Sequence, residues 1–192
     1  MNRALPPHPS LEQLKKQAKD LRKGHQSALA EAAERIKACL PRLAEASAED
    51  ILQGDFSLQE AQHVIACEYG CKHWEMLCGV VAADLNMLAG LRDVHIQDLL
   101  REIDQQDCTR AFNGAGPIVS ERMLSNMSRR VRTIICEEIE ANSDLAEEER
   151  VAARHKILAK AVEMAAAGQI EWAGKVDVVA MERAIERGDF DL

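Results

Sequence analysis

The sequence is poor in aromatic residues and contains no long apolar run. Aromatic side chains make up 3% of the 192 residues, although apolar residues as a whole make up 47%. A core must therefore be built from Leu, Ile, Val, Ala and Met, and this composition favours helices over strands. No apolar run approaches the roughly 20 residues that a membrane-spanning helix needs. The sequence predicts an all-α protein without direct membrane insertion.

Signals of secretion are also missing. The first ten residues, MNRALPPHPS, contain no apolar segment of the kind that a signal peptide needs. The six cysteines lack the spacing of a secreted disulfide scaffold, so we expect reduced thiols in a cytoplasmic protein. They are Cys39, Cys67, Cys71, Cys78, Cys108 and Cys136.

The charge balance is acidic, with a formal net charge of −8. Residues 1–80 carry 10 basic and 11 acidic side chains, whereas the remainder carries 14 basic and 21 acidic ones. Binding to a phosphate backbone needs clustered Lys and Arg, so this balance argues against a nucleic-acid partner. The first helix is locally basic, and we interpret its lysines as a solvated face.

Enzyme signatures are absent from the sequence. It has no GxSxG, HExxH, Walker or GxGxxG sequence, so we predict neither an enzyme nor a bound cofactor. His63 and Cys67 are four residues apart on one expected helix and are weak candidates for a zinc site. The alternative is a packed apolar face with His63 at its edge. His95 is expected at the surface and His155 in the core.

The order of helix signals divides the chain into four segments. They are an extended N-terminus at 1–9, a helical module at 10–88, a second helical domain at 91–173 and a tail at 174–192. Gly90 is the best candidate for the boundary between the two domains. One or two helical turns are expected in the tail, around Ala180–Arg187.

Caps mark several helices of the first module. Ser10 with Gln13, and Ser57 with Glu60, have the spacing of capping boxes. Ser47 is expected to cap a short helix that ends at Gln53. Gly24 and Gly70 are expected to end helices, Gly70 in a left-handed conformation. The apolar stripes are expected to face inward, and they include Leu11, Leu14, Ala18 and Leu21, then Leu29, Ala33, Ile36 and Leu40.

Five helices are expected in the second domain, at about 94–104, 105–114, 117–126, 129–142 and 145–167. Asp144 is expected to cap the last helix, with three glutamates in its first turn, and Gly168 to end it. Ser128 is a good N-cap for the helix at 129–142.

The helix at 129–142 combines an apolar stripe with a row of charges. Its stripe is formed by Val131, Ile134, Ile135 and Ile139, at the spacing of one buried face. Glu138 falls inside that apolar arc, where an unpaired carboxylate is costly. Either the stripe drifts around the helix, or Glu138 has a basic partner on a neighbouring element.

Four segments of the second domain carry a family resemblance. HIQDLLREID, AFNGA, SNMSRR with its following acids, and AAAGQIEW occur in that family's order without gaps. The region from Arg92 to Trp172 resembles the C-terminal domain of the flagellar motor switch protein FliG. This resemblance implies a small right-handed, armadillo-like stack of helices.

A second resemblance covers the first module. LEQLKKQAKDL and AQHVIACEYGCKHWEML are similar to a small helical module found ahead of ankyrin repeats in bacterial proteins. The repeats themselves are absent, because no period of about 33 residues occurs. This match implies architecture and little about function.

The resemblance to FliG implies a set of contact residues on the helix at 129–142. Arg130 matches the family's basic residue after NMS, with Arg129 beside it, and Glu137 and Glu138 match its acid pair. Asn113 stands where the family has Lys, and Ala146 where it has Arg. In the family these charges meet charges on the stator, and such complementarity sets register and association rate.

Two functions are compatible with these residues. The first is a non-enzymatic protein-interaction module for motility and chemotaxis, at the cytoplasmic face of the flagellar motor, with stator or switch components as partners. The alternative is a stand-alone regulatory or structural adaptor that uses the same fold outside the motor. No MFxF hinge precedes Arg92, which favours the alternative. The sequence leaves the partner, and assembly into a homo-oligomer, open.

Overall fold

The computed structural model describes residue 3, residue 6 and residues 9–172. These residues form α-helices and short 3₁₀ helices, and none of them lies in a strand. The prediction of an all-α fold is confirmed. Each helix in this part of the chain is too short or too polar to traverse a lipid bilayer.

The chain forms two compact units, residues 1–78 and 79–192, which are described separately. The division falls within helix α5 (Trp74–Val81), earlier than the end at residue 88 predicted for the first module. The 3₁₀ helix η2 (Leu85–Leu88) packs against a helix of the second unit, and the carbonyl of Met87 is bonded to Trp172. These contacts attach the segment after α5 to the second unit.

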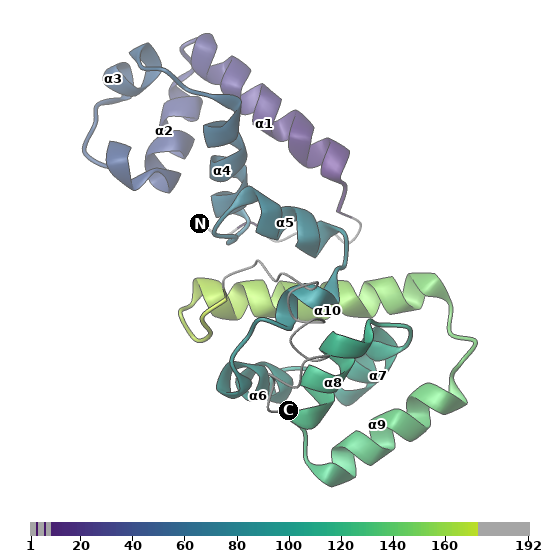
Figure 1. Cartoon of the computed structure of the whole chain (residues 1–192). Coiled ribbons are helices and arrows are strands. Elements are labelled where there is room, and N and C mark those ends of the chain that lie inside the picture. Colours follow the sequence, from purple (N-terminus) through teal and green to yellow (C-terminus); the bar gives the residue numbers. More distant parts are fainter. Residues whose placement is uncertain (1–2, 4–5, 7–8, 173–192) are drawn as a thin grey trace, which may run out of the picture. The chain divides into compact units, whose positions relative to one another are not determined.

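Helices α1, α2 and α4 form the centre of the first unit, where α1 packs against both α4 and α2 (Figure 1). Leu14, Ala18 and Leu21 are buried, as the stripe on α1 predicts. Leu29 is 55% exposed instead of facing inward, because α2 begins only at the next residue. The elements are α1 (Leu11–Gln26), α2 (Ala30–Cys39), η1 (Pro41–Leu43), α3 (Ala48–Gln53) and α4 (Leu58–Glu68).

Local capping decides where these helices begin. Ser57 Oγ accepts from the Glu60 amide at 3.2 Å, and the Glu60 carboxylate accepts from the Ser57 amide at 2.8 Å, which confirms this capping box. The expected cap at Ser47 is confirmed as well. The capping box at Ser10 is wrong, since its side chain makes no cap hydrogen bond. Gly24 does not end α1, which continues to Gln26.

Burial acts to raise the pKa of Glu60, but hydrogen bonds from Ser57 and Arg42 hold it below its usual value. Because the folded pKa is lowered, this carboxylate stabilises the folded protein above its unfolded pKa. That contribution is lost as the pH falls through the folded pKa.

The two serines provide a matched test of capping. We expect Ser57→Ala to lower the free energy of unfolding by about 1 kcal/mol, because the amide of Glu60 loses the hydroxyl that accepts its hydrogen bond. Ser10→Ala removes no hydrogen bond of a helix cap, so it should change the free energy of unfolding by no more than a few tenths of a kcal/mol. Urea unfolding followed by circular dichroism measures both. Equal effects of the two substitutions would contradict the assignment.

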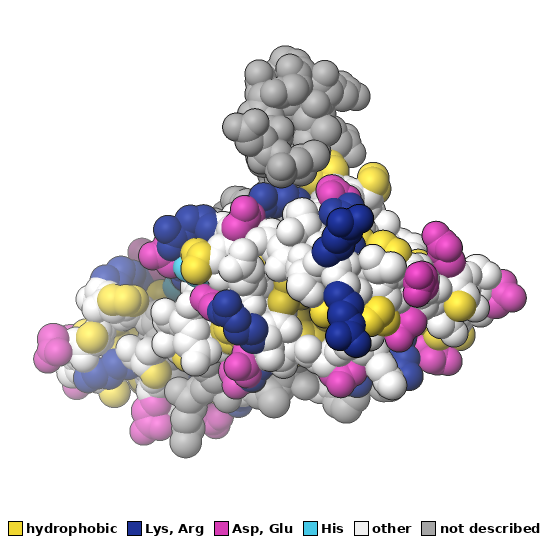
Figure 2. Space-filling view, turned by 90° about the horizontal axis from the view of Figure 1, so that it is seen from below, with side chains coloured by type: hydrophobic (Ala, Val, Ile, Leu, Met, Phe, Trp, Pro, Cys, Tyr) yellow, Lys and Arg dark blue, Asp and Glu magenta, His cyan; other side chains and the backbone are white. Residues whose placement is uncertain are grey.

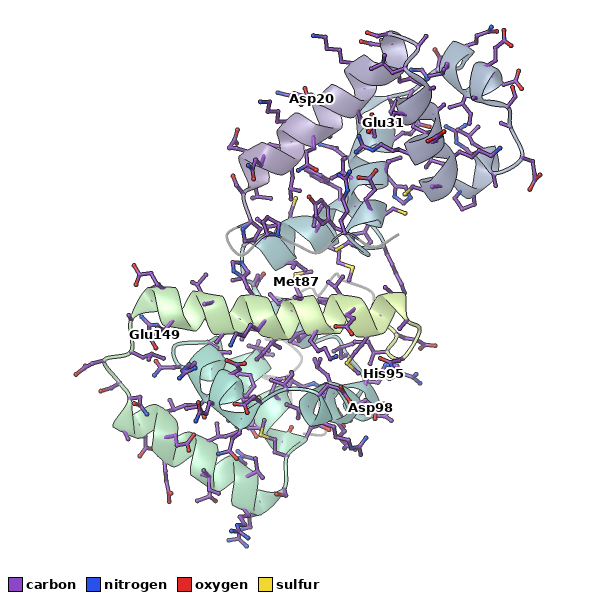
Figure 3. The ribbon with its side chains drawn as sticks, turned by 180° about the vertical axis from the view of Figure 1, so that it is seen from behind. Asp20, Glu31, Met87, His95, Asp98 and Glu149 are labelled. Carbon is purple, nitrogen blue, oxygen red and sulfur yellow. The ribbon has the colours of Figure 1, made fainter. Side chains whose placement is uncertain are left out.

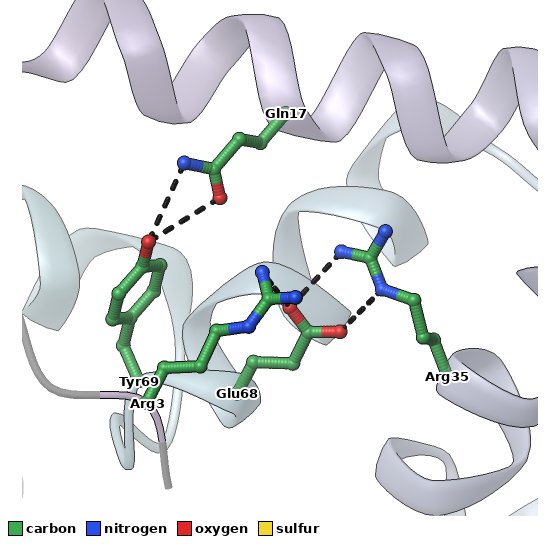
Figure 4. Close-up of polar contacts among 5 residues, drawn as sticks. All are labelled: Arg3, Gln17, Arg35, Glu68 and Tyr69. Carbon is green, nitrogen blue, oxygen red and sulfur yellow. Dashed lines mark hydrogen bonds and ion pairs between the residues drawn. The ribbon is translucent and has the colours of Figure 1, made fainter.

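A buried carboxylate joins α2 to the end of α4 (Figure 4). Glu68 accepts from Arg35 Nε at 2.6 Å and from Arg35 Nη2 at 3.0 Å, and it forms an ion pair with Arg3 at 3.3 Å. The hydrogen bond with Glu68 holds the pKa of Arg35 above its usual value. The two-pronged geometry is typical of strong Arg–carboxylate pairs. After Tyr69, Gly70 adopts φ +76° and turns the chain, as expected of a residue that ends a helix.

Loss of the negative charge of Glu68 should lower the stability of the folded protein. We expect Glu68→Gln to lower the free energy of unfolding by about 2 kcal/mol, because the Arg35 guanidinium keeps only neutral acceptors in a half-buried position. Glu12→Gln is the control. Its partner Lys15 is half exposed and Glu12 is 87% exposed, so this change should cost about 0.3 kcal/mol or less. Chemical denaturation of both variants checks the difference, and a cost for Glu68→Gln no larger than that of the control would refute the role of this pair.

The second unit is layered around α7 (Gln105–Phe112), which lies between α10 and α9 (Figure 1). Helix α10 packs along α7 and also contacts α6. Helix α8 packs against η2. The other helices are α6 (Asp93–Arg101), α8 (Pro117–Ser125), α9 (Arg129–Ala141) and α10 (Glu147–Ala166).

Helix α10 provides the longest buried face of this unit. Its buried residues include Ile157, Leu158 and Val162. It begins one residue after Ala146, which makes no side-chain cap, so the expected cap by Asp144 is wrong. The three glutamates occupy its first turn as predicted, and Gly168 follows its end with φ +72°.

The chain after α10 closes the unit against α6 and η2. Trp172 is 1% exposed, and its indole Nε1 donates to the carbonyl of Met87 at 2.9 Å. His95 was expected at the surface and is instead buried. Its Nδ1 accepts from the amide of Glu171 at 3.3 Å, which explains the burial. Figure 3 shows α6, with His95, beside the end of α10 that is opposite Glu149. The helical turns expected around 180–187 lie outside the described residues.

Candidate functional site

Helix α9 is the element on which the predicted contact residues lie. Ser128 begins it as expected, because its hydroxyl accepts from the amide of Val131 at 3.3 Å. The helix packs mainly on α7. It therefore forms the outer layer of the second unit on the side away from α10 (Figure 1).

The apolar stripe of α9 is only partly buried. Ile135 is 1% exposed, whereas Val131, Ile134 and Ile139 are only partly buried. The prediction of one fully buried face is thus right at the centre of the helix and wrong at its flanks. One neighbouring helix cannot cover the whole stripe, so α9 keeps apolar surface that the described part of the chain leaves uncovered.

Glu138 resolves the conflict between its charge and the apolar arc in a third way. Its Oε2 accepts from the hydroxyl of Thr109 at 2.7 Å, and its Oε1 accepts from the side-chain amide of Gln105 at 3.5 Å. Both partners are neutral and come from α7. Within the described residues it forms no ion pair, so the expected basic partner is replaced by neutral donors. Hydrogen bonding makes the half-buried carboxylate tolerable without a counter-charge.

Asn113 lies inside the unit and not on its surface. It is 5% exposed, and its Nδ2 donates to the carbonyl of Asn142 at 2.7 Å. Its own carbonyl accepts from Arg154 Nη2 at 3.0 Å. It ties the end of α7 to the end of α9 and to α10. This predicted contact residue thus helps to position α9, and its side chain is almost fully buried.

Four charged side chains of α9 point to solvent without a partner. Arg129, Arg130, Glu137 and Glu140 are exposed, and none forms a side-chain hydrogen bond or ion pair with the described residues. By contrast, Arg132 pairs with Glu121 at 3.0 Å. Figure 2 shows the side on which α9 lies, where basic, acidic and apolar side chains are interspersed.

These charges are arranged against the dipole of their own helix. Two arginines occupy the first turn of α9 and the glutamates lie toward its end, with no acid in the first turn and no base in the last. A helix dipole favours the opposite order. Helix α10 has that favourable order, with three glutamates in its first turn. Arg129, Arg130, Glu137 and Glu140 therefore gain nothing from the dipole of their own helix, and they form either an ordinary solvated face or a contact surface.

This reversed order generates a stability prediction. Arg130→Glu should raise the free energy of unfolding by about 0.5 kcal/mol, because an acid in the first turn interacts favourably with the dipole and no ion pair is lost. Arg132→Glu is the control and should lower it, since it breaks the pair with Glu121. Urea unfolding compares the two variants. A clear loss of stability in Arg130→Glu would mean that Arg130 supports the fold.

Two hollows flank α9. A polar one of about 370 Å³ contains Thr109, Asn113 and Glu138. The other has a volume of about 350 Å³ and lies between the end of α6, the start of α7 and the N-terminal half of α9. Its wall includes Leu100, Ile103 and Met127, which the sequence did not distinguish from ordinary core residues. Burial raises the pKa of Cys108 in this wall to about 12, so its thiol is neutral.

The weak zinc candidates lie on α4 of the first unit. His63 and Cys67 are both half-buried. Within the described residues, no group of three or more His, Cys, Asp or Glu side chains is arranged to hold a metal ion.

Comparison with known proteins identifies the second unit. Residues 83–172 match the family model of the FliG C-terminal domain. The flagellar motor switch protein FliG of Pseudomonas aeruginosa is 33% identical over 88 residues, which make up 46% of this chain and 26% of that protein. The FliG protein of Vibrio cholerae is 32% identical over 90 residues, or 47% of this chain and 26% of that protein.

These matches show a region like the FliG C-terminal domain and an all-α fold of that type. The matched part spans about a quarter of the length of the curated relatives, 26% in both cases. It begins at residue 83, before the start at Arg92 recognised in the sequence, and includes η2 with Met87. It ends at Trp172, the residue whose indole binds Met87.

Proposed function

We propose that this chain is a non-enzymatic protein-interaction module of the flagellar motor switch, and that the exposed charges of α9 contact its partner. The region like the FliG C-terminal domain supports a role in motility and chemotaxis. The observation that carries the contact face is the set of exposed, unpaired charges on a helix whose dipole they oppose. Its place would be the cytoplasmic face of the motor, with a stator or switch component as partner.

The physical role of this face is recognition more than tight binding. Exposed charges that have no partner among the described residues can meet opposite charges without breaking an ion pair seen in this structure. Complementary charges of this kind guide encounter and set register, while contributing modestly to affinity. Arg129 and Arg130 would meet acids of the partner, and Glu137 would meet bases. Glu138 accepts a hydrogen bond from Thr109, so it would act on a partner mainly through the electrostatic potential of its negative charge.

A second candidate function is an adaptor that uses the same fold with a partner outside the motor. The observation that favours it is the loss of two bases relative to the family pattern. Asn113 replaces one of them and is buried, and Ala146 replaces the other at the start of α10. A charged face with fewer bases would suit a partner with a different charge pattern.

Affinity capture with the full chain distinguishes these functions. The wild type is compared with an Arg130→Glu, Glu137→Lys variant by mass spectrometry of captured proteins. We expect motor proteins in the wild-type sample and their loss from the variant. Capture should also weaken as the salt concentration rises well above about 0.1 M, because exposed charges are then screened beyond about 10 Å.

A matched control is a Lys19→Glu, Asp20→Lys variant on α1. It exchanges one base and one acid at exposed positions of the first unit, so the net charge stays unchanged. It should retain all partners of the wild type. Motor proteins that remain bound to the α9 variant would disprove the contact face. Partners without any motor protein would replace the first function by the second.

A further inference from the structure

Cys39 and Cys67 are two thiols that the fold of the first unit brings together. Cys39 is the last residue of α2 and Cys67 the last but one of α4, and these two helices pack against each other. Arg35, one turn before Cys39, donates to Glu68, the residue after Cys67, at 2.6 Å (Figure 4). This bond holds the ends of the two helices together, with a cysteine beside each of its partners.

The ionisation of Cys39 reports the same neighbours. Burial, and next hydrogen bonding to the thiol of Cys67, raise the pKa of Cys39 to about 12. The negative charge of Glu68 acts on Cys39 in the same direction, and Cys39 in turn acts on Arg35. The two thiols and the ion pair therefore lie in one cluster, which joins α2 to α4.

Access from solvent distinguishes this pair from the other cysteines. Cys39 and Cys67 are free thiols, and both are partly exposed. Cys71 and Cys108 are buried, and burial raises the pKa of each to about 12. Cys78 is partly exposed, but the thiol near it is the buried Cys71. The sixth cysteine lies on α9 of the second unit.

We infer that Cys39 and Cys67 are a redox-sensitive switch, which forms a reversible disulfide between α2 and α4 when the chain meets a small disulfide oxidant such as glutathione disulfide. In a reducing compartment, disulfides of this kind are transient and serve sensing or catalysis. This inference goes beyond the proposed function and does not depend on it, because it concerns the first unit alone.

The reaction is a thiol–disulfide exchange in two steps. The thiolate of Cys67, formed by loss of a proton to solvent, attacks one sulfur of glutathione disulfide and releases one glutathione thiolate. Cys39 then loses its proton, and its thiolate attacks the sulfur of Cys67 and releases the second glutathione thiolate. The two released thiolates take up the two protons. The protein loses two electrons, which reduce one glutathione disulfide to two molecules of glutathione.

The order of the two steps follows from the environment of Cys39. Its raised pKa keeps the proton on its sulfur at neutral pH, and only a thiolate attacks a disulfide. Cys39 therefore acts second, when the mixed disulfide on Cys67 is already beside it.

The disulfide has a structural consequence for the first unit. It closes a loop over residues 40–66, which contain η1, α3 and most of α4. Closure of such a loop restricts the unfolded chain and so favours the folded state. The oxidised first unit should thus resist unfolding more than the reduced one.

Peptide mapping of the full chain tests the inference. The protein is incubated with glutathione disulfide without denaturant, blocked with N-ethylmaleimide, and cleaved with trypsin and a glutamate-specific protease. Cleavage after Glu68 separates Cys67 from Cys71, so the expected product is ACLPR joined to AQHVIACE. We expect this product in most molecules, and its loss after treatment with dithiothreitol.

Two results of the mapping overturn the inference. The first is a mixed disulfide of Cys67 with glutathione that never proceeds to the linked peptides. The second is a different linkage in their place, such as Cys71 with Cys78.

Urea unfolding of the first unit provides an independent measurement. We expect a midpoint about 1 M higher for the oxidised wild type than for the reduced one. Cys39→Ser and Cys67→Ser cannot form the disulfide, so glutathione disulfide should not raise their midpoints. Circular dichroism under reducing conditions checks that both variants fold.

Cys78→Ser is the matched control, because Cys78 is another partly exposed cysteine of the first unit. It should keep the full increase of the midpoint and the linked peptides. An increase that persists in Cys39→Ser, or that is lost in Cys78→Ser, refutes the inference. The linked peptides of the wild type decide the question even if a serine variant does not fold.

Discussion

The architecture of the second unit depends on α7, which packs against α10 on one side and α9 on the other. The face of α10 that contacts it and α6 is apolar and buried, and Trp172 closes the end of this core through its bond to Met87. Helix α9 lies outside this core and buries only Ile135 completely. It is attached to α7 by this apolar contact and by polar contacts of Thr109 with Glu138 and of Asn113 with Asn142. A helix held in this way keeps most of its surface available for another molecule.

The surface of α9 carries both exposed charged side chains and partly exposed apolar ones. Arg129 and Arg130 oppose the dipole of α9 and have no partner in the described chain, so they do not stabilise the helix. Val131 follows them in the chain, is only partly buried and lines a hollow between α6, α7 and α9. Within the described residues, unpaired charges and partly buried apolar side chains thus occur in the same half of one helix.

Much of the fold could be predicted because its signals are local in the chain. Capping by Ser57 and Ser128, the left-handed turn at Gly70 and the end of α10 near Gly168 depend on residues within a few positions of each other. The failures at Ser10 and Asp144 are of a different kind. Ser10 does occupy the N-cap position of α1, but its side chain makes no cap hydrogen bond. Asp144 has the right chemistry, but α10 begins only at Glu147, with Ala146 at the N-cap position.

The sequence by itself determined the helix content, most helix ends and the charges of α9, because these follow from composition and short spacings. Only the tertiary structure decided which of those residues a partner can reach. Asn113 is turned inward by Asn142 and Arg154, and Glu138 is bound by Thr109, which is 29 positions away. The hollow beside Val131 is formed by residues of α6, α7 and α9 that are up to 38 positions apart in the chain, from 97 to 135. Such contacts between distant residues leave no signal in local spacing, so exposure and burial at the site had to come from packing.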